Sequence, residues 1–242
     1  MSPARKDIHN SRVPVLCQSC EARHNGMCGA LNAEELLAFA RHTRVVRHGA
    51  GEELLTEGAP ITSYGNMIRG VVKLVRTLAD GRRQIVGLQF APDFVGRLHA
   101  DASVVTAEAA SEVELCRISK PALERLVADN PTLERRLLAQ ALREVDEARE
   151  WMVALGRKTA SEKVASFLGQ IGRHLDPIVE NHAPILVFEL PLTRSEIADF
   201  LGLTIGTVSR ELSKLRRDKV IDIKSHRRIE ILDSLRLLQR SG

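Results

Sequence analysis

Apolar residues change their spacing along this chain of 242 residues. Between residues 44 and 118 they form short runs separated by turns that contain Gly, Pro and Asp, which is typical of β-strands. Asp80-Gly81, between two of these runs, indicates a tight hairpin. Many short strands with regularly spaced turns predict a small antiparallel β-barrel or jelly roll. The expected strands contain residues 45–46, 68, 71–75, 84–88 and 113–118.

The pattern becomes helical from Pro121 onward. Pro121 begins a short helix, and Asn130-Pro131 restarts the chain in a long helix that runs to about Leu155. Apolar residues recur along the long helix at spacings of three and four, with Arg and Glu on the flanks, which favours pairing with a second copy of the helix. Packing against the chain's own barrel is the alternative. The expected homodimer seam consists of Leu138, Ala141, Val145, Ala148, Met152 and Leu155.

Residues 193–215 have the pattern of a helix-turn-helix. Thr193 with Glu196 three residues later predicts a capped first helix, Gly202 supplies the positive φ of a tight turn, and Thr204 caps the second helix. In a recognition helix the outward residues near the N-terminus meet base edges, and an arginine such as Arg210 can bind guanine bidentately. The expected DNA-binding residues are Thr193, Thr204, Gly206, Thr207, Ser209, Arg210, Ser213 and Lys214.

The charge distribution agrees with a DNA-binding C-terminal region. Residues 193–242 hold 11 Lys and Arg against 7 Asp and Glu, a net charge of +4, and the rest of the chain holds 24 of each kind. All the excess positive charge therefore lies where a phosphate-binding surface is expected. Beyond the second helix, residues 220–223 and 229–232 resemble the two strands of a wing.

Composition narrows the class of protein. A hydrophobic fraction of 44% and a charged fraction of 27% are those of a soluble globular protein. No apolar run approaches a membrane span, and the first residues lack the apolar segment of a secretory signal, so we expect a cytoplasmic protein. Gly-x-Ser-x-Gly, P-loop and His-Glu-x-x-His motifs are all missing from the sequence, so no enzymatic function is expected.

The four cysteines form the most distinctive chemical pattern. Cys17, Cys20 and Cys28 lie in an N-terminal arm with little apolar periodicity, and Cys116 lies alone in a predicted strand. We expect this arm, residues 1–30, to lack a core of its own and to be ordered by what it binds. Four thiolates suit zinc or an iron–sulfur cluster. A local zinc site with His24 as fourth ligand, which would leave Cys116 as a core thiol, remains open.

Taken together, these motifs resemble the CRP/FNR family of transcription regulators, and within it the FNR branch of the FnrL/FnrN type. The resemblance rests on the predicted barrel and long helix, on the motifs at residues 192–204 and 207–210, and on the spacing of the cysteines. The resemblance implies an α+β fold with a jelly-roll, cyclic-nucleotide-binding-like sensor domain, a dimerisation helix and a C-terminal winged helix-turn-helix. The corresponding ranges are 1–30 for the cluster-binding arm, 31–120 for the barrel, 121–158 for the dimerisation helix and 159–242 for the DNA-binding domain.

The resemblance also implies a function. A [4Fe–4S] cluster on Cys17, Cys20, Cys28 and Cys116 would promote homodimerisation at low oxygen. The dimer would read a TTGAT-N4-ATCAA-like palindrome and activate or repress genes of microaerobic and anaerobic metabolism. The hairpin tip that would contact RNA polymerase consists of Asp80, Gly81, Arg82 and Arg83.

Two positions depart from patterns known in this family. Gly206 stands where a glutamate usually accepts a hydrogen bond from a base and braces the arginine, here Arg210, so an altered or relaxed DNA site is expected. Cyclic-nucleotide pockets use a Gly-Glu-Leu and an arginine, whereas this chain has Gly96-Arg97-Leu98 and no arginine within residues 103–106. A phosphodiester without its arginine would bind poorly, so no cyclic nucleotide is expected.

Overall fold

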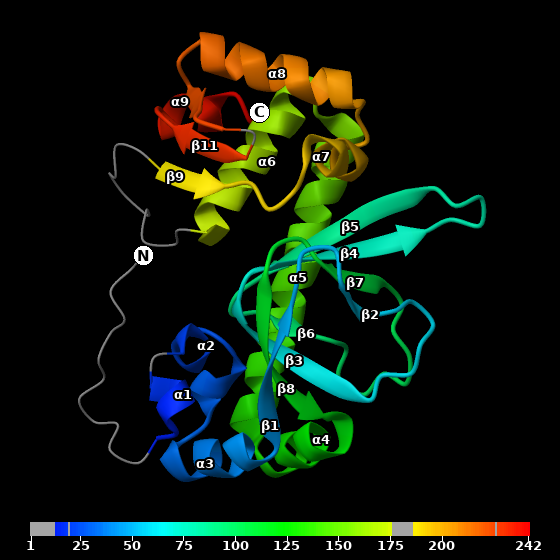
Figure 1. Cartoon of the computed structure of the whole chain (residues 1–242), viewed down its shortest axis with the longest axis vertical. Helices are drawn as coiled ribbons and strands as arrows, with labels where there is room; N and C mark the ends of the chain where they lie inside the picture. Colours follow the sequence, from blue (N-terminus) through cyan, green and yellow to red (C-terminus); the bar gives the residue numbers. More distant parts are fainter. Residues whose placement is uncertain (1–12, 19, 176–185, 226) are drawn as a thin grey trace. The chain divides into compact units, whose positions relative to one another are not determined.

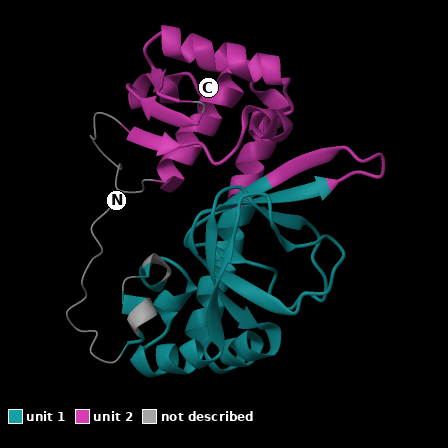
Figure 2. Cartoon of the chain, viewed as in Figure 1, with its two compact units in different colours: residues 1–76, 87–145 teal, residues 77–86, 146–242 magenta. Residues whose placement is uncertain are grey.

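The computed structural model describes residues 13–18, 20–175, 186–225 and 227–242, which form two compact units (Figures 1 and 2). The N-terminal unit comprises Met1–Arg76 and Gly87–Val145, and the C-terminal unit comprises Thr77–Val86 and Asp146–Gly242. One long helix, α5 (Pro131–Arg157), belongs partly to each unit.

Two four-stranded sheets build the predicted jelly roll. One has the order β1-β8-β3-β6, and the other has the order β2-β7-β4-β5. Buried apolar side chains from both sheets, such as Met67 and Val72, form one core cluster between them. The strand bounds are β1 (Thr43–His48), β2 (Glu53–Leu55), β3 (Ser63–Arg69), β4 (Val71–Thr77), β5 (Arg83–Phe90), β6 (Phe94–Val95), β7 (Thr106–Ala109) and β8 (Val113–Ser119).

Three of these strands, β2, β6 and β7, do not follow from the apolar pattern. Strand β7 reads Thr-Ala-Glu-Ala, and its Glu108 is buried. Glu108 lies opposite Lys73 of β4, and its carboxylate is 3.1 Å from the Lys73 ammonium. A buried charge is tolerated when it is paired. Strand β7 can therefore hold a glutamate at a buried position, where the apolar pattern used to recognise strands expects an apolar residue.

Helices flank the sheets of the N-terminal unit, and a local signal sets the start of α3 (Ala33–Arg41). The Asn32 side chain accepts hydrogen bonds from the backbone N–H groups of Glu34 and Glu35, and the Glu35 carboxylate accepts one from the Asn32 N–H. The bounds are α1 (Val15–Gln18), α2 (Glu21–His24), a 3₁₀ turn η1 (Met27–Ala30), α3 (Ala33–Arg41) and α4 (Lys120–Asp129).

The described part of the arm contributes to a core that it shares with the rest of the N-terminal unit, and ordering of the arm by what it binds stays a prediction. Val13, Met27 and Cys28 are buried in a second core cluster, and Met27 is only 1% exposed. The cluster also takes side chains from α3, β8, α4 and α5. Met27 and Cys28 are adjacent and Val13 is distant in the sequence, so no strand or helix periodicity reveals these arm residues. Residues 1–12 of the predicted arm lie outside the described part.

The C-terminal unit is the expected winged helix-turn-helix. Trp151 of α5 packs edge-on against Phe200, with ring centroids 4.5 Å apart, and Phe167 lies beside both. The predicted wing has a third strand, because β9 pairs with β11 in the sheet order β10-β11-β9. The bounds are α6 (Ala160–Leu175), β9 (Leu186–Glu189), α7 (Arg194–Leu201), α8 (Ile205–Arg217), β10 (Ile221–Ile223), β11 (Arg228–Ile231) and α9 (Ser234–Gln239).

None of the helices in the described ranges has both the length and the apolar composition to span a membrane.

Candidate thiol cluster and nucleic-acid interface

Cysteines that are far apart in the sequence come together in the second core cluster. Cys116 of β8 lies between Val45 of β1 and Asn66 of β3 in the sheet register. Both Cys116 and Cys28 are buried members of this cluster, and Cys17 packs against it. The Asn66 side-chain amide lies 3.8 Å from the Sγ atom of Cys28, so it can donate a weak hydrogen bond to that sulfur. The strand register therefore brings Cys116 to the same buried region as the arm.

The proximity of the thiols is reflected in their electrostatics. Burial, followed by the charges of Cys116 and Cys20, raises the pKa of Cys17 to about 11. Burial also raises the pKa of Cys28 far above its usual range, with additional contributions from Cys116, Cys20 and Cys17. Burial and then Cys20 raise the pKa of Cys116. Every pair among the four groups thus interacts electrostatically when ionised, and a bound cation would relieve the repulsion between the thiolates.

The donor set is chemically suited to an iron–sulfur cluster or to zinc. Within the described ranges, no three His, Cys, Asp or Glu side chains are arranged to hold a metal ion. The thiols would therefore have to turn toward a common centre. The Asn66 Oδ1 atom is buried and has no hydrogen-bond partner among the described residues. A polar amide beside clustered thiols can donate a hydrogen bond to a thiolate that holds a bound group, and so orient that ligand. His24, the alternative fourth ligand, is exposed.

The helix-turn-helix has the predicted local geometry. The Thr193 hydroxyl accepts from the Glu196 N–H in a capping box at the start of α7. Gly202 ends α7 with φ of +62°, a left-handed conformation that glycine adopts without strain. The Thr204 hydroxyl accepts from the Thr207 N–H, 3.1 Å away, at the start of α8. The inner face of α8 is buried, as expected, through Val208, Leu212 and Leu215.

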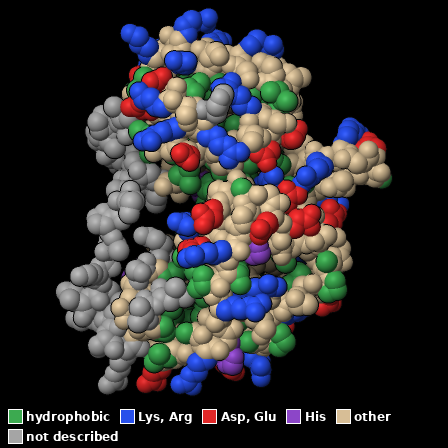
Figure 3. Space-filling model, viewed as in Figure 1, with side chains coloured by type: hydrophobic (Ala, Val, Ile, Leu, Met, Phe, Trp, Pro, Cys, Tyr) green, Lys and Arg blue, Asp and Glu red, His purple; other side chains and the backbone are tan. Residues whose placement is uncertain are grey.

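The opposite face of α8 presents the predicted DNA-binding side chains. Gly206, Arg210, Ser213 and Lys214 are exposed, whereas Ser209 is half-buried. Lys and Arg side chains gather along the edge of the unit that α8 forms (Figure 3). The Ser213 hydroxyl donates to the Ser209 carbonyl, 2.8 Å away, so its proton is already used within the helix.

A contact between Arg210 and Thr207 was not predicted. The Arg210 Nη2 atom donates to the Thr207 hydroxyl over 3.0 Å. A Cβ atom placed on Gly206 would lie 3.6 Å from the Arg210 Nη1 atom. Position 206 is therefore next to the guanidinium, and the threonine hydroxyl provides the only side-chain oxygen that Arg210 contacts in the described part. The i, i+3 spacing of Thr207 and Arg210 was the signal in the sequence.

Helix α5 leaves its predicted seam exposed. Leu138 is 58% exposed and Met152 is 71% exposed. Ala141, Val145 and Ala148 are exposed as well, and only Leu155 is half-buried. The helix packs within each unit through side chains that do not belong to the seam. Those that are buried in the described part are Leu133, Leu137, Gln140, Trp151 and Ala154. The apolar seam is thus available to a partner.

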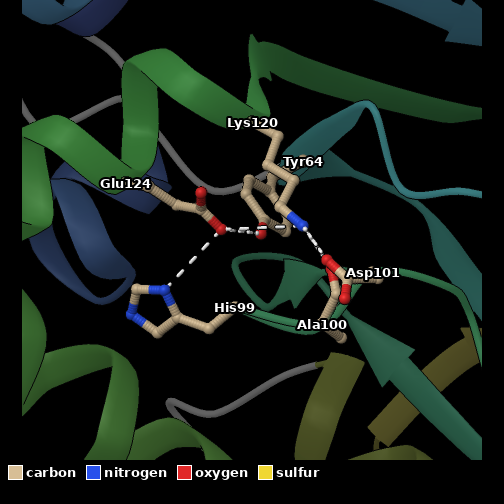
Figure 4. Close-up of polar contacts among 6 residues, drawn as sticks. All are labelled: Tyr64, His99, Ala100, Asp101, Lys120 and Glu124. Carbon is tan, nitrogen blue, oxygen red and sulfur yellow. Dashed lines mark hydrogen bonds and ion pairs between the residues drawn. The ribbon is translucent and has the colours of Figure 1, made fainter.

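The loop between β6 and β7 is tied to α4 by polar contacts that sequence reasoning missed (Figure 4). The Lys120 ammonium donates to the Ala100 carbonyl over 2.6 Å. The Tyr64 hydroxyl donates to the Glu124 carboxylate over 2.9 Å. Gly96, which begins this loop, has φ of +125°, and a Cβ atom there would lie 2.7 Å from the Tyr64 ring. Glycine is therefore required at this point.

The hairpin tip between β4 and β5 is the predicted turn. The Leu78 N–H donates to the Arg82 carbonyl over 2.8 Å, and Gly81 has φ of +84°. The exposed Asp80 carboxylate accepts from the Arg82 N–H and from its guanidinium, and these hydrogen bonds lower the pKa of Asp80. The contact of this tip with RNA polymerase stays a prediction.

Comparison with known proteins decides the family. Residues 162–240 match the Crp-like helix-turn-helix domain, and residues 45–130 match the cyclic nucleotide-binding domain. The chain is 48% identical over 233 residues to a probable transcriptional activator of Rhizobium leguminosarum bv. viciae, covering 96% of each protein. This chain belongs to the CRP/FNR family of transcription regulators. As a member of that family it is a DNA-binding transcriptional activator.

Two further CRP/FNR relatives agree with this assignment. The transcriptional activator protein FnrL of Cereibacter sphaeroides is 38% identical over 235 residues, which cover 95% of this chain and 94% of FnrL. The structure of FixK2 from Bradyrhizobium japonicum superposes with a TM-score of 0.74 at 30% identity, covering 83% of this chain and 98% of that one. The predicted CRP/FNR fold and family are therefore confirmed.

Proposed function

We propose that this CRP/FNR activator responds to oxygen through a [4Fe–4S] cluster held by Cys17, Cys20, Cys28 and Cys116. One observation carries the proposal: the three thiols of the arm and the distant Cys116 share one electrostatically coupled, largely buried region. When bound, the cluster would supply iron that oxygen can oxidise. Zinc on the same thiols is the alternative, and it would make the site structural.

The all-sulfur donor set supports an iron–sulfur cluster over a local zinc site. A site made of Cys17, Cys20, Cys28 and His24 would leave Cys116 unused. The structure instead places Cys116 close enough to interact electrostatically with Cys17, Cys20 and Cys28, and it leaves His24 at the surface. Soft thiolate ligands are those that iron–sulfur clusters require.

The arm is linked to α5 by direct contacts within the N-terminal unit. Leu133 and Leu137 of α5 are buried in the same core cluster as Cys28 and Cys116. The Arg136 guanidinium of α5 donates to the His24 carbonyl of the arm over 2.8 Å. A change in how the thiols are held would therefore alter the packing of this end of α5, because close-packed cores transmit displacement.

We infer that α5 converts this packing change into dimerisation. The exposed seam from Leu138 to Met152 would pair with the same seam of a second copy. A dimer presents two α8 helices to two half-sites, so a few kcal/mol at the seam would change promoter occupancy strongly. The expected target is an FNR-like palindrome, and the exposed tip at residues 80–83 would face RNA polymerase.

In this proposal each of three side chains of α8 makes a different DNA contact. Arg210 would bind guanine, Ser209 would contact the neighbouring base edge, and Lys214 would neutralise a phosphate. Cyclic nucleotide has no role in it, because Arg97 stands where the ribose-binding carboxylate is expected and residues 103–106 contain no arginine.

The test is to purify the protein without oxygen and to record its visible spectrum, iron and sulfide content, oligomeric state and promoter binding before and after exposure to air. About four irons per chain and an absorbance that bleaches in air, together with loss of the dimer, would support oxygen sensing. Cys116→Ser should lose the iron, while His24→Ala should keep it. A colourless protein with one zinc would overturn the sensing proposal and leave a constitutive DNA-binding activator.

A further inference from the structure

We propose that the N-terminal unit carries a second ligand site, a basic pocket that binds a phosphate-bearing small molecule. The pocket has a volume of about 390 Å³ and lies where β1 and β3 begin and β8 ends. Four of its lining side chains are Arg41, His42, Arg44 and Arg117. The others include the hydroxyls of Thr43, Thr62, Ser63 and Ser119, and none is an Asp or a Glu.

The strand register places two arginines directly opposite each other. Arg44 of β1 pairs with Arg117 of β8, and on the other side of β8 Arg117 pairs with Gly65. Residues that face each other across antiparallel strands share one face of the sheet, and like charges in that position repel. Gly65 provides neither a carboxylate nor any side chain to separate the charges. A bound anion would convert this repulsion into attraction.

The guanidinium groups have few protein partners. Throughout the described ranges, Arg41, Arg44 and Arg117 form no ion pair with a carboxylate, although Arg47 of the same strand β1 does so with Glu114. Arg117 donates from Nε to the Ser63 hydroxyl over 2.7 Å, which orients the group and leaves its terminal nitrogens available. An arginine cluster without carboxylates retains its full capacity to bind an external anion.

The arginine pair of this pocket lies on the opposite face of the sheet from the thiol of Cys116. Arg117 follows Cys116 directly in β8, and consecutive residues of a strand point to opposite faces of the sheet. On the arginine face, Val46 and Leu115 belong to the core between the two sheets. Thr43 and Ile118 also line the pocket but share the face of Cys116, and the Thr43 side chain forms a hydrogen bond with the Cys116 thiol. The pocket therefore adjoins the thiol region at the end of the sheet, while its paired arginines lie on the other face.

The chemistry selects a phosphate group. Guanidinium forks bind phosphate through paired hydrogen bonds, and the hydroxyls of Thr62, Ser63 and Ser119 can supplement them. A volume of about 390 Å³ is within the range of small-molecule sites, so it accommodates more than the phosphate itself. A phosphate ester such as a nucleotide or a sugar phosphate would use both the charge and the space.

The test is calorimetric titration of the full-length chain, in chloride buffer, with inorganic phosphate, ATP and glucose 6-phosphate. We expect at least one probe to bind with a Kd below about 1 mM. Arg44→Gln and Arg117→Gln should each weaken that binding at least about tenfold. Arg125→Gln, which removes an exposed arginine of α4 outside the pocket, should leave it unchanged. Arg210→Gln combined with Lys214→Gln should also leave it unchanged, which separates this pocket from the DNA-binding face.

The melting temperature is a second readout, which distinguishes lost binding from a misfolded variant. In the same chloride buffer without phosphate, Arg44→Gln should raise the melting temperature, because it removes one of the two charges that repel each other. Added phosphate should raise the melting temperature of the unaltered chain more than that of the variant. Stronger binding of ATP or glucose 6-phosphate than of phosphate would identify an ester as the ligand, and equal binding would assign the site to the phosphate group alone. The proposal is overturned if every probe binds more weakly than about 1 mM or if both arginine variants retain the affinity.

Discussion

The side-chain amide of Asn66 lies 3.8 Å from the Sγ atom of Cys28, and both residues are buried. Asn66 is also the cross-strand neighbour of Cys116 in β8. One buried polar residue therefore lies beside two of the proposed cluster ligands, one from the arm and one from the barrel.

Asn66→Leu should weaken the retention of the metal group and leave the fold intact. Outer-shell partners of metal ligands contribute about 10–100-fold to metal affinity, and loss of one buried hydrogen bond changes the unfolding free energy by about 1 kcal/mol. The measurement is the iron that remains after anaerobic treatment with a chelator. Met67→Leu, the next residue of β3, is the control because its side chain belongs to the other core cluster. Equal iron retention in both variants would contradict this role of Asn66.

Ala141→Lys should convert the protein to a monomer under anaerobic conditions, because it inserts a charge in the proposed seam of α5. Ala139→Lys is a matched control, since Ala139 is exposed on the same helix but on a different side. The measurement is light scattering coupled to gel filtration, together with the affinity for a palindromic promoter. If both variants remained dimeric, the seam would lie elsewhere.

Gly206→Glu should sharpen discrimination between FNR-like sites and their single-base variants by about 1–3 kcal/mol. The new carboxylate would grow from a Cβ position 3.6 Å from the Arg210 guanidinium and could brace it against the base. Gly206→Ala separates this effect from helix propensity, because it brings only the gain of about 1 kcal/mol in the helix. Identical sequence preferences in the glutamate and alanine variants would show that the carboxylate adds no readout.

Arg210→Gln and Lys214→Gln should affect DNA binding in different ways. Loss of Arg210 should reduce the preference for one base pair by about 1–3 kcal/mol, whereas loss of Lys214 should weaken binding to all sequences and lower the salt dependence by about one phosphate contact. Competition binding at several salt concentrations separates the two. Salt dependence that is unchanged in Lys214→Gln would remove this side chain from the phosphate contacts.

The thiol of Cys17 should react slowly in the metal-free chain. Burial raises its pKa from 9.0 to about 11, and since the protonated form is the unreactive one, about 100-fold less thiolate is present at neutral pH than for an unperturbed thiol. The alkylation rate at Cys17, followed by mass spectrometry, should therefore continue to rise above about pH 9 and level off only above about pH 11. A plateau near about pH 9 would show that the thiol is not buried.

The winged helix-turn-helix was accessible to sequence reasoning because its signals are local. Thr193, Gly202 and Thr204 act on backbone groups within four residues of themselves, so their chemistry determines the helix starts and the turn wherever the segment lies. The exposed apolar stripe of α5 was also predictable, because helical periodicity places its residues on one face, while its role as a dimer seam stays a prediction. In the same way Asp80-Gly81 identified the hairpin.

The thiol region and the basic pocket depend on strand register, which acts over long distances along the chain. Cysteine spacing suggested a shared site, but only the pairing of β8 with β1 and β3 places Cys116 beside Asn66 and Arg44 opposite Arg117. The ion pair of Lys73 with Glu108 has the same origin. Such contacts are determined by which strands become neighbours, and since a slip of one residue would reverse every face, they emerge only when the whole sheet is assembled.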